Sequence, residues 1–140
     1  MISTSMVENK IAAIQRDLSE LMRFKDLSLD LVASSYDTHK VIERVIEVVI
    51  NEAIDINQHL IVESGLGQLG FNFRESFLLL AKIGVYSQDF ADRIAPSVGL
   101  RNILVHQYRD LDETLFYQAM QDCLRDYTEY CRHIMKFIRK

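Results

Sequence analysis

Apolar and polar residues follow a helical period along most of the chain. Near the N-terminus five aliphatic residues are spaced by four, three, four and three positions, namely Val7, Ile11, Ile14, Leu18 and Leu21. This spacing places them on one face and predicts a helix over residues 7–23. Residues 24–35 mix Asp and Ser with apolar residues without that period. We interpret them as an irregular connection that packs partly against the body.

The second predicted helix starts near Asp37, a good N-cap residue, and runs to about Val62. Between residues 41 and 56 apolar and mostly β-branched side chains cover nearly every side. The length of this stretch without Gly or Pro decides for a helix and against a strand. A helix that is apolar all round is buried on all sides, which is hard to arrange within one small subunit. The pattern therefore predicts a dimer interface.

One polar strip interrupts this apolar helix. Its members are spaced by one, three or four positions, and they are Asn51, Glu52, Asp55, Gln58 and His59. Such spacing brings the carboxylates and the histidine close together on one face. Two interpretations stay open: the strip faces solvent, or it lines a polar cleft opposite the segment around residue 101.

Glycines and capping residues mark the elements that follow. Residues 63–71 hold three glycines and are predicted to form a loop. Asn72 and Glu75 then have the spacing of a capping box, and Gly84 is placed to end the short helix that this box begins.

The last part of the chain holds two more predicted helices. Ser87 can cap the first, and Pro96 either kinks it or starts a fresh helix, because proline suits only a first turn. Asp110 or Asp112 can cap the last helix, whose apolar residues repeat at helical spacing over residues 115–138.

Composition agrees with one helical domain spanning residues 1–140. The chain has 49% hydrophobic residues, one Pro and five Gly, so breakers of long helices are few. No apolar run is long enough to cross a bilayer, and residues 1–10 lack the apolar core of a signal peptide. Cys123 and Cys131 lie eight positions apart in one predicted helix, about 12 Å at roughly 1.5 Å per residue, too far for a disulfide. A reduced, cytoplasmic protein is the natural interpretation.

Three chemically versatile side chains, Arg101, His106 and Tyr108, crowd into the apolar segment 98–108. On a helix Asn102 and His106 share a face, whereas Arg101 and His106 point roughly 140° apart. A partner subunit across a two-fold axis would close that gap. A histidine in apolar surroundings suits acid–base work near neutral pH, and arginine fits phosphate oxygens. From spacing alone, structural roles stay open, such as a hydrogen-bonded core histidine and half of an ion pair.

The segment from Gly99 to Tyr108 resembles the Arg-x4-His-x-Tyr signature of the HEPN superfamily, in particular its HepT type. These are toxin ribonucleases encoded beside a minimal nucleotidyltransferase called MntA. Residues 74–81 and 52–59 also resemble the corresponding segments of these proteins, and the order of helices matches along essentially the whole chain.

This resemblance implies an all-α, up-and-down helical bundle of about five helices that forms a homodimer with the two motifs facing each other. It implies RNA cleavage without a metal or cofactor, with His106 as general acid or base and Arg101 stabilising charge on the phosphorane. Asn102 would orient the site, and Glu52 and Asp55 match acidic family positions with a supporting role.

Tyr108 matches the tyrosine that the nucleotidyltransferase adenylylates to silence the toxin in a type VII-like toxin–antitoxin pair. The net charge of −4 fits tight RNA binding poorly. Either the cleft is locally basic, with Arg101, Arg109 and Arg93 gathered across the dimer, or the substrate is held weakly.

Two other functions stay open beside the ribonuclease. One is a non-catalytic helical module that binds and regulates a nucleotidyltransferase partner. The other is a helical dimer that binds nucleotide or nucleic acid without cutting it. None of the three involves a membrane.

Overall fold

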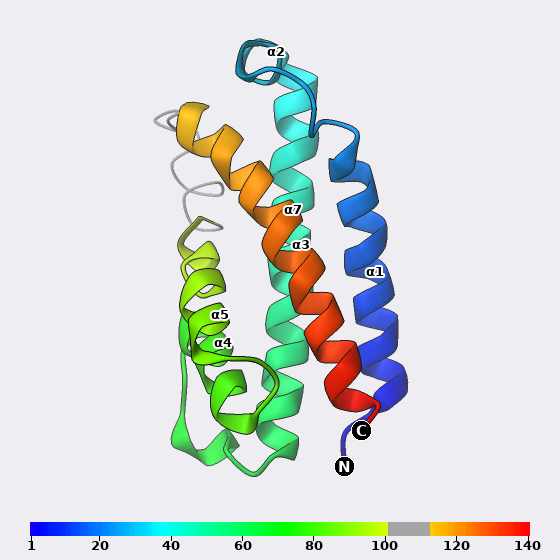
Figure 1. Cartoon of the computed structure of the whole chain (residues 1–140), viewed down its shortest axis with the longest axis vertical. Helices are drawn as coiled ribbons and strands as arrows, with labels where there is room; N and C mark the ends of the chain where they lie inside the picture. The colour runs from blue at the N-terminus through cyan, green and yellow to red at the C-terminus, as the bar shows by residue number, and fades with distance from the viewer. Residues whose placement is uncertain (101–112) are drawn as a thin grey trace.

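The computed structural model describes residues 1–100 and 113–140, and every regular element in them is helical (Figure 1). The predicted all-α bundle is confirmed. The elements in chain order are α1 (Thr4–Met22), α2 (Leu29–Ser34), α3 (Tyr36–Glu63), the 3-10 turn η1 (Gly67–Leu69), α4 (Phe73–Ile83), α5 (Gln88–Ile94) and α7 (Glu113–Ile138).

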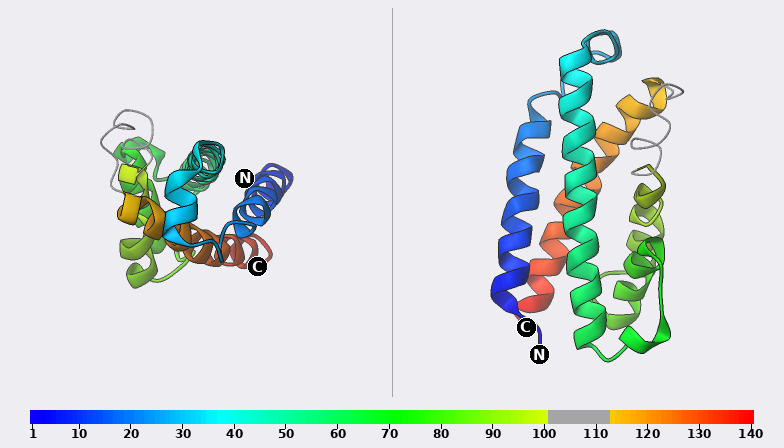
Figure 2. Two further views of the ribbon diagram at one scale, coloured as in Figure 1. Left: turned by 90° about the horizontal axis from the view of Figure 1, so that it is seen from above. Right: turned by 180° about the vertical axis from the view of Figure 1, so that it is seen from behind.

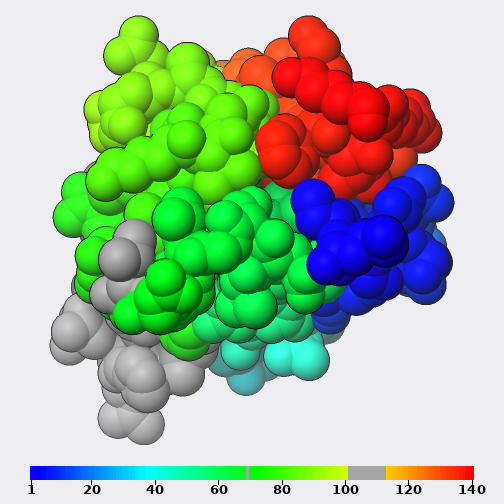
Figure 3. Space-filling model, turned by 90° about the horizontal axis from the view of Figure 1, so that it is seen from below, coloured from blue at the N-terminus to red at the C-terminus, as the bar shows by residue number. Residues whose placement is uncertain are grey.

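The three long helices α1, α3 and α7 form the body of the bundle. Helix α1 packs on both α3 and α7, while α4 packs on α3 and α5 packs on α4 and α7. Seen from above, α4 and α5 lie on the side of α3 that is away from α1 (Figure 2). Seen from below, the start of α1 and the end of α7 lie side by side, next to the green surface of α4 and α5 (Figure 3). The motif segment, residues 101–112, follows Leu100 and precedes α7 in the sequence.

Helix α1 buries the stripe that its spacing predicted. All five aliphatic residues of the stripe are buried: Val7, Ile11, Ile14, Leu18 and Leu21. The helix is three residues longer at its start than predicted, because Ser3 accepts a hydrogen bond from the backbone N–H of Met6 and caps it there. The connection after α1 is more regular than expected, since Ser28 caps the short helix α2.

The apolar side chains on all sides of α3 are mostly buried within a single chain. Ile42, Ile46, Val49 and Ile50 are fully buried, and only isolated apolar residues such as Val41 stay exposed. Helix α3 achieves this because α1, α4 and α7 each cover part of its circumference. One chain therefore buries this helix without a partner, so the prediction of a dimer interface from its apolar pattern was wrong, and the homodimer stays a prediction on other grounds.

Caps and turns largely follow the sequence signals. Asn72 and Glu75 form the predicted capping box, and Gly84 ends α4 with a left-handed φ of 96°. Helix α3, however, is capped by Ser35, whose hydroxyl oxygen accepts from the N–H of Thr38 at 3.3 Å. Asp37, the predicted cap, instead lies in the first turn, where its negative charge suits the helix dipole.

A buried hydrogen-bond network ties α7 to α3 and α4. The Tyr130 hydroxyl donates to Asn57 Oδ1 at 2.6 Å, and Asn57 Nδ2 donates to Ser76 Oγ at 3.1 Å. The side chains of Tyr130, Asn57 and Ser76 are fully buried, so each polar group needs the partner it has. No pattern in the sequence had predicted this network.

The remaining expectations concern cysteines and membranes. Cys123 and Cys131 are both buried in α7 and both free, as predicted. No helix in the described part of the chain is long and apolar enough to cross a membrane.

Candidate functional site

The motif residues Arg101, Asn102, His106 and Tyr108 lie outside the described residues, as does Arg109. The structure describes the residues on either side of the motif segment. They comprise the helical residues that lead into the segment and the start of α7 that follows it, and a hollow lies between them.

The chain enters the motif segment through a fresh helical stretch after Pro96. Helix α5 ends at Ile94, a turn follows at Ala95 and Pro96, and residues 97–100 are helical. The N–H of Gly99 donates to the carbonyl of Pro96 at 3.0 Å. Proline has no N–H to continue the preceding helix, but it suits a first turn. Of the two predicted alternatives, the fresh start is therefore correct.

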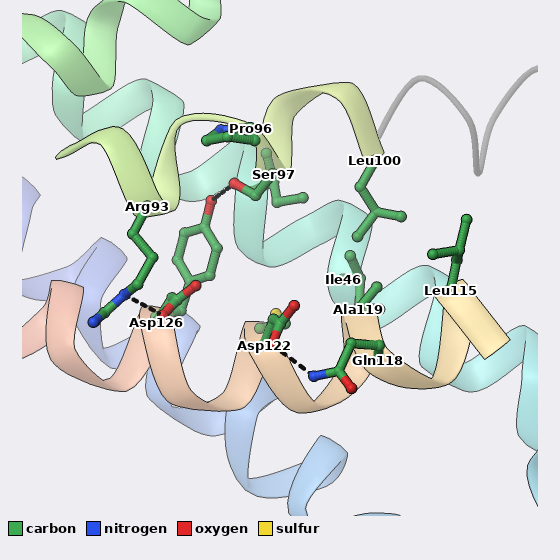
Figure 4. Close-up of a pocket in the computed structure, with 13 residues that line it drawn as sticks. Ile46, Arg93, Pro96, Ser97, Leu100, Leu115, Gln118, Ala119, Asp122 and Asp126 are labelled. Carbon is green, nitrogen blue, oxygen red and sulfur yellow. Dashed lines mark hydrogen bonds and ion pairs between the residues drawn. The ribbon is translucent and has the colours of Figure 1, made fainter. Parts of the chain in front are cut away.

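Beside this entry lies a hollow of about 240 Å³ between α3, α5, residues 96–100 and α7 (Figure 4). Its walls are mainly apolar and come from four separate stretches of the chain. The residues that line it are Ile46, Ile50, Arg93, Pro96, Ser97, Leu100, Leu115, Gln118, Ala119, Asp122, Cys123, Asp126 and Tyr127. Leu100 directly precedes Arg101 in the chain, so the hollow adjoins the motif segment.

Polar groups of the hollow are already paired with each other. The hydroxyls of Ser97 and Tyr127 are 2.7 Å apart and hydrogen-bonded, and Gln118 Nε2 donates to Asp122 Oδ1 at 2.9 Å. Cys123 is no candidate nucleophile, because burial raises the pKa of its thiol well above the usual value.

Arg93, one of the three arginines considered for a locally basic cleft, faces two carboxylates. Its Nε lies 3.0 Å from Asp126 Oδ1, and it also forms an ion pair with Glu129. Arg125 approaches the same Asp126 oxygen at 2.9 Å. In this chain the charge of Arg93 is thus balanced, and a basic cleft would depend on Arg101 and Arg109.

The chain leaves the motif segment at Glu113, beside a buried histidine. His39 Nε2 lies 3.1 Å from Glu113 Oε2, and His39 Nδ1 lies 2.8 Å from Glu43 Oε1. The imidazole also stacks on Phe116, with the ring centroids 3.9 Å apart. His39 and Glu43 were missed as candidates; the available signal was a histidine and a glutamate four positions apart in an otherwise apolar helix.

The polar strip of α3 meets α1. Lys10 Nζ lies 3.1 Å from both Glu52 Oε2 and Asp55 Oδ2, and the ring of His59 accepts a hydrogen bond from the N–H of Ser3 at 2.9 Å. The structure thus brings the two carboxylates together around a lysine, on a partly exposed face.

Glu52 and Asp55 lie roughly 140–160° around α3 from Ile50, which lines the hollow. Within one chain they therefore point away from the hollow beside Leu100. Their predicted supporting role at the motif stays a prediction. No group of three His, Cys, Asp or Glu side chains suited to a metal ion occurs in residues 1–100 and 113–140.

Comparison with known proteins decides the family. The family model described as "Ribonuclease HepT-like" matches residues 14–134, which is most of the chain. The chain belongs to the HepT-like ribonuclease family. The predicted membership of the HEPN superfamily in its HepT type, and with it the class of ribonuclease, is confirmed.

Similar proteins include two HepT nucleases. A tRNA nuclease HepT from Aphanizomenon flos-aquae (strain 2012/KM1/D3) is 35% identical over 137 residues, covering 98% of this HepT-like chain and 92% of the relative. An mRNA nuclease HepT from Shewanella oneidensis (strain MR-1) is 35% identical over 77 residues, covering 55% of this chain and 57% of the relative.

A solved structure extends the likeness to the fold. A tri-AMPylated HEPN toxin of Shewanella oneidensis, in complex with its MNT antitoxin, matches with a TM-score of 0.81 at 26% identity. The match covers 94% of this HepT-like chain and 97% of the toxin. The described helices are therefore arranged as in a toxin that has been crystallised with its antitoxin.

Proposed function

We propose that this HepT-like protein is the ribonuclease toxin of a toxin–antitoxin pair, and that it cuts RNA with Arg101 and His106 without a metal ion. The observation that carries the proposal is the family match over residues 14–134, together with the Arg-x4-His-x-Tyr spacing at residues 101–108. The nuclease names of both relatives support RNA as the substrate.

In the proposed reaction His106 takes the proton of the ribose 2′-hydroxyl. The 2′-oxygen then forms a bond to phosphorus, the bond from phosphorus to the 5′-oxygen breaks, and the leaving oxygen receives a proton from His106. Arg101 stabilises the negative charge of the phosphorane, and Asn102 orients the site. The expected products are a 2′,3′-cyclic phosphate and a free 5′-hydroxyl.

A homodimer is part of this proposal, because Arg101 and His106 diverge on one ideal helix. In a two-fold pair each His106 would work with the Arg101 of the other subunit. Mixing Arg101→Ala with His106→Ala protein should then restore partial activity through hybrid dimers. If the mixture stays as inactive as its two components, each active site is built from one chain.

The partner in this proposal is a MntA-type nucleotidyltransferase that adenylylates Tyr108. An adenylate adds bulk and negative charge, which would repel the substrate phosphate beside Arg101 and His106. The AMPylated toxin crystallised with an MNT antitoxin supports this regulation. The proposed place of action is the cytoplasm, where the two buried thiols would stay reduced.

Cleavage of RNA in EDTA tests the activity. Wild-type protein should cut tRNA or mRNA in EDTA, and His106→Ala should lower the rate at least about a hundredfold, as expected for a lost general acid–base group. His59→Gln, a histidine change on the α1 side of α3, is the matched control and should behave as wild type. Equal rates for wild type and His106→Ala would leave a non-catalytic binding module as the better assignment.

Mass spectrometry tests the regulation. Co-expression with the cognate nucleotidyltransferase should add adenylate mass to the peptide that holds Tyr108, and Tyr108→Phe should stay unmodified and toxic. An adenylate found on another residue, or on none, would refute the role of Tyr108 while leaving the nuclease assignment intact.

A further inference from the structure

We infer that the hollow between α3, α5 and α7 binds one uncharged nucleobase of the RNA and so selects the bases beside the cleavage site. This inference rests on the proposed function, since it names a subsite for the same substrate.

Position along the chain links the hollow to the motif. Leu100 lines the hollow, and His106 follows six residues later, so the two lie at most about 22 Å apart even for fully extended chain. On the far side Leu115 also lines the hollow. A single-stranded substrate held at His106 therefore has one of its next bases within reach of the hollow.

Size and lining suit one flat, apolar-faced group. About 240 Å³ is below the roughly 300–1,000 Å³ of sites for drug-sized ligands, so it fits a base but no longer stretch of RNA. Ile46, Leu100, Leu115 and Ala119 gather at one end, where a base face can lie against aliphatic side chains (Figure 4). Leu115 is 66% exposed, which places an apolar side chain at the mouth of the hollow.

The charges of the hollow favour a neutral ligand. Arg93 and Arg125 face the carboxylates of Asp122, Asp126 and Glu129, so the cations are already paired. A phosphate would meet an excess of negative charge, and a lysine or arginine of another protein would compete with two arginines already in place. An uncharged base is not repelled by the carboxylates and does not compete with the two arginines.

One edge of the hollow can read the base. Asp122 accepts hydrogen bonds from Gln118 and contacts Arg125, and both contacts end on Oδ1. Oδ2 has no such contact in the described part of the chain, so it can accept from an amino group of cytosine, adenine or guanine. Uracil has no exocyclic amino group, so the hollow should favour the other three bases over uracil.

Filling the hollow gives the first test. Ala119→Leu should raise the KM for short oligoribonucleotides about tenfold or more and leave kcat within about twofold, because the lost contact is made in ground state and transition state alike. Ala12→Leu, at an exposed position of α1, is the matched control and should keep the wild-type KM. An Ala119→Leu enzyme with wild-type KM on every substrate would overturn the assignment.

Removing the carboxylate gives the second test. Wild type should cleave oligo(C) and oligo(A) with a kcat/KM at least about tenfold above that for oligo(U), as expected when a polar reading group is left unpaired by the wrong base. Asp122→Asn should lower that ratio severalfold, whereas Asp26→Asn, an exposed carboxylate between α1 and α2, should not. A ratio near one in wild type, or one unchanged in Asp122→Asn, argues against base reading by Asp122.

Equilibrium binding separates this inference from the proposed function. Fluorescent oligo(C) and oligo(U) are titrated with His106→Ala protein, with and without Ala119→Leu. If wild type cuts no RNA but Ala119→Leu still weakens oligo(C) binding, the nuclease proposal fails and the base site stands. If Ala119→Leu instead weakens only self-association or antitoxin binding, the hollow belongs to a protein interface and the base assignment is wrong.

Discussion

Lys10 and His39 each lie between two carboxylates, and helix α3 supplies at least one carboxylate to both. In the first cluster Lys10 of α1 lies 3.1 Å from both Glu52 and Asp55. The lysine side chain is 28% exposed and Asp55 is 51% exposed. Water therefore screens these charges, and pairs of this kind contribute about 0–1 kcal/mol each.

The second cluster places a histidine, His39, between the carboxylates of Glu43 and Glu113. The side chain of His39 is 5% exposed and that of Glu43 11%, and the imidazole stacks on Phe116. Polar groups at such a site cost free energy when they lose a partner, so the loss of one member should destabilise the fold more than in the first cluster. We therefore expect exposure to decide how much each cluster contributes to stability, although the sequence pattern is similar in both.

The largest expected effect is that of His39→Ala. This change removes a stacked ring and leaves the buried Glu43 without its histidine, so the free energy of unfolding should fall by about 3–4 kcal/mol. Urea denaturation followed by circular dichroism measures it. Lys10→Ala is the matched control at the exposed cluster and should cost less than about 1 kcal/mol. Similar losses in both variants would show that exposure does not distinguish the clusters.

A smaller effect is expected for the carboxylates of the exposed cluster, and it concerns catalysis. If Glu52 and Asp55 support the motif, Glu52→Gln and Asp55→Asn should each lower kcat about tenfold, which corresponds to about 1.4 kcal/mol. Lys10→Met removes the ion pair but keeps both carboxylates, so it should retain kcat. Full activity in both carboxylate variants would limit their role to pairing with Lys10.

The next effect is the pH dependence of the Lys10 cluster. Partial burial lowers the pKa of Lys10, but hydrogen bonds to Asp55 and Glu52 outweigh it, and the net shift is upward from 10.5. Its contribution to stability is thus fully present below pH 10.5 and is lost as the pH rises through the folded-state value. The difference in unfolding free energy between wild type and Lys10→Met, below about 1 kcal/mol at pH 7, should shrink above pH 10.5. If this difference in unfolding free energy stays constant above pH 10.5, it comes from packing of the aliphatic part of Lys10 and not from its charge.

The smallest effect is that of salt. In 1 M NaCl the Debye length is about 3 Å, so the Lys10→Met difference should approach zero. The His39→Ala loss should change little, because ring stacking and burial do not depend on screening. If 1 M NaCl reduces the loss of unfolding free energy by the same fraction in both variants, both clusters behave as surface ion pairs.

Much of the fold could be predicted from local signals. The stripe of α1, the capping box at Asn72 and the end of α4 at Gly84 each depend on a few neighbouring residues, and each is confirmed. The start of α3 moved from Asp37 to Ser35 because these two residues, two positions apart, both suit a cap. The burial of α3 was misjudged because it depends on how much of the helix α1, α4 and α7 cover. The sequence of α3 alone does not contain this information.

The candidate site was only partly predictable for the same reason. The spacing of Arg101, His106 and Tyr108 is local and contributed to the family resemblance, whereas the hollow beside Leu100 is made by four stretches that meet only in the folded chain. His39 likewise gains its partner Glu113 from a position 74 residues away. The spacing of Glu52 and Asp55 predicted that they share one face of the helix. It did not predict that Lys10 of α1 would pair with both of them.

The buried network of Tyr130, Asn57 and Ser76 sets the longitudinal register of α7. Sliding α7 by one turn along α3 would strand the Tyr130 hydroxyl among aliphatic side chains, so a single alignment is favoured. Glu113 lies 17 residues before Tyr130, about 26 Å along the same helix. The buried side chain of Tyr130 thus fixes the position of Glu113, about 26 Å away along α7, and Glu113 is where the segment bearing Arg101 and His106 ends.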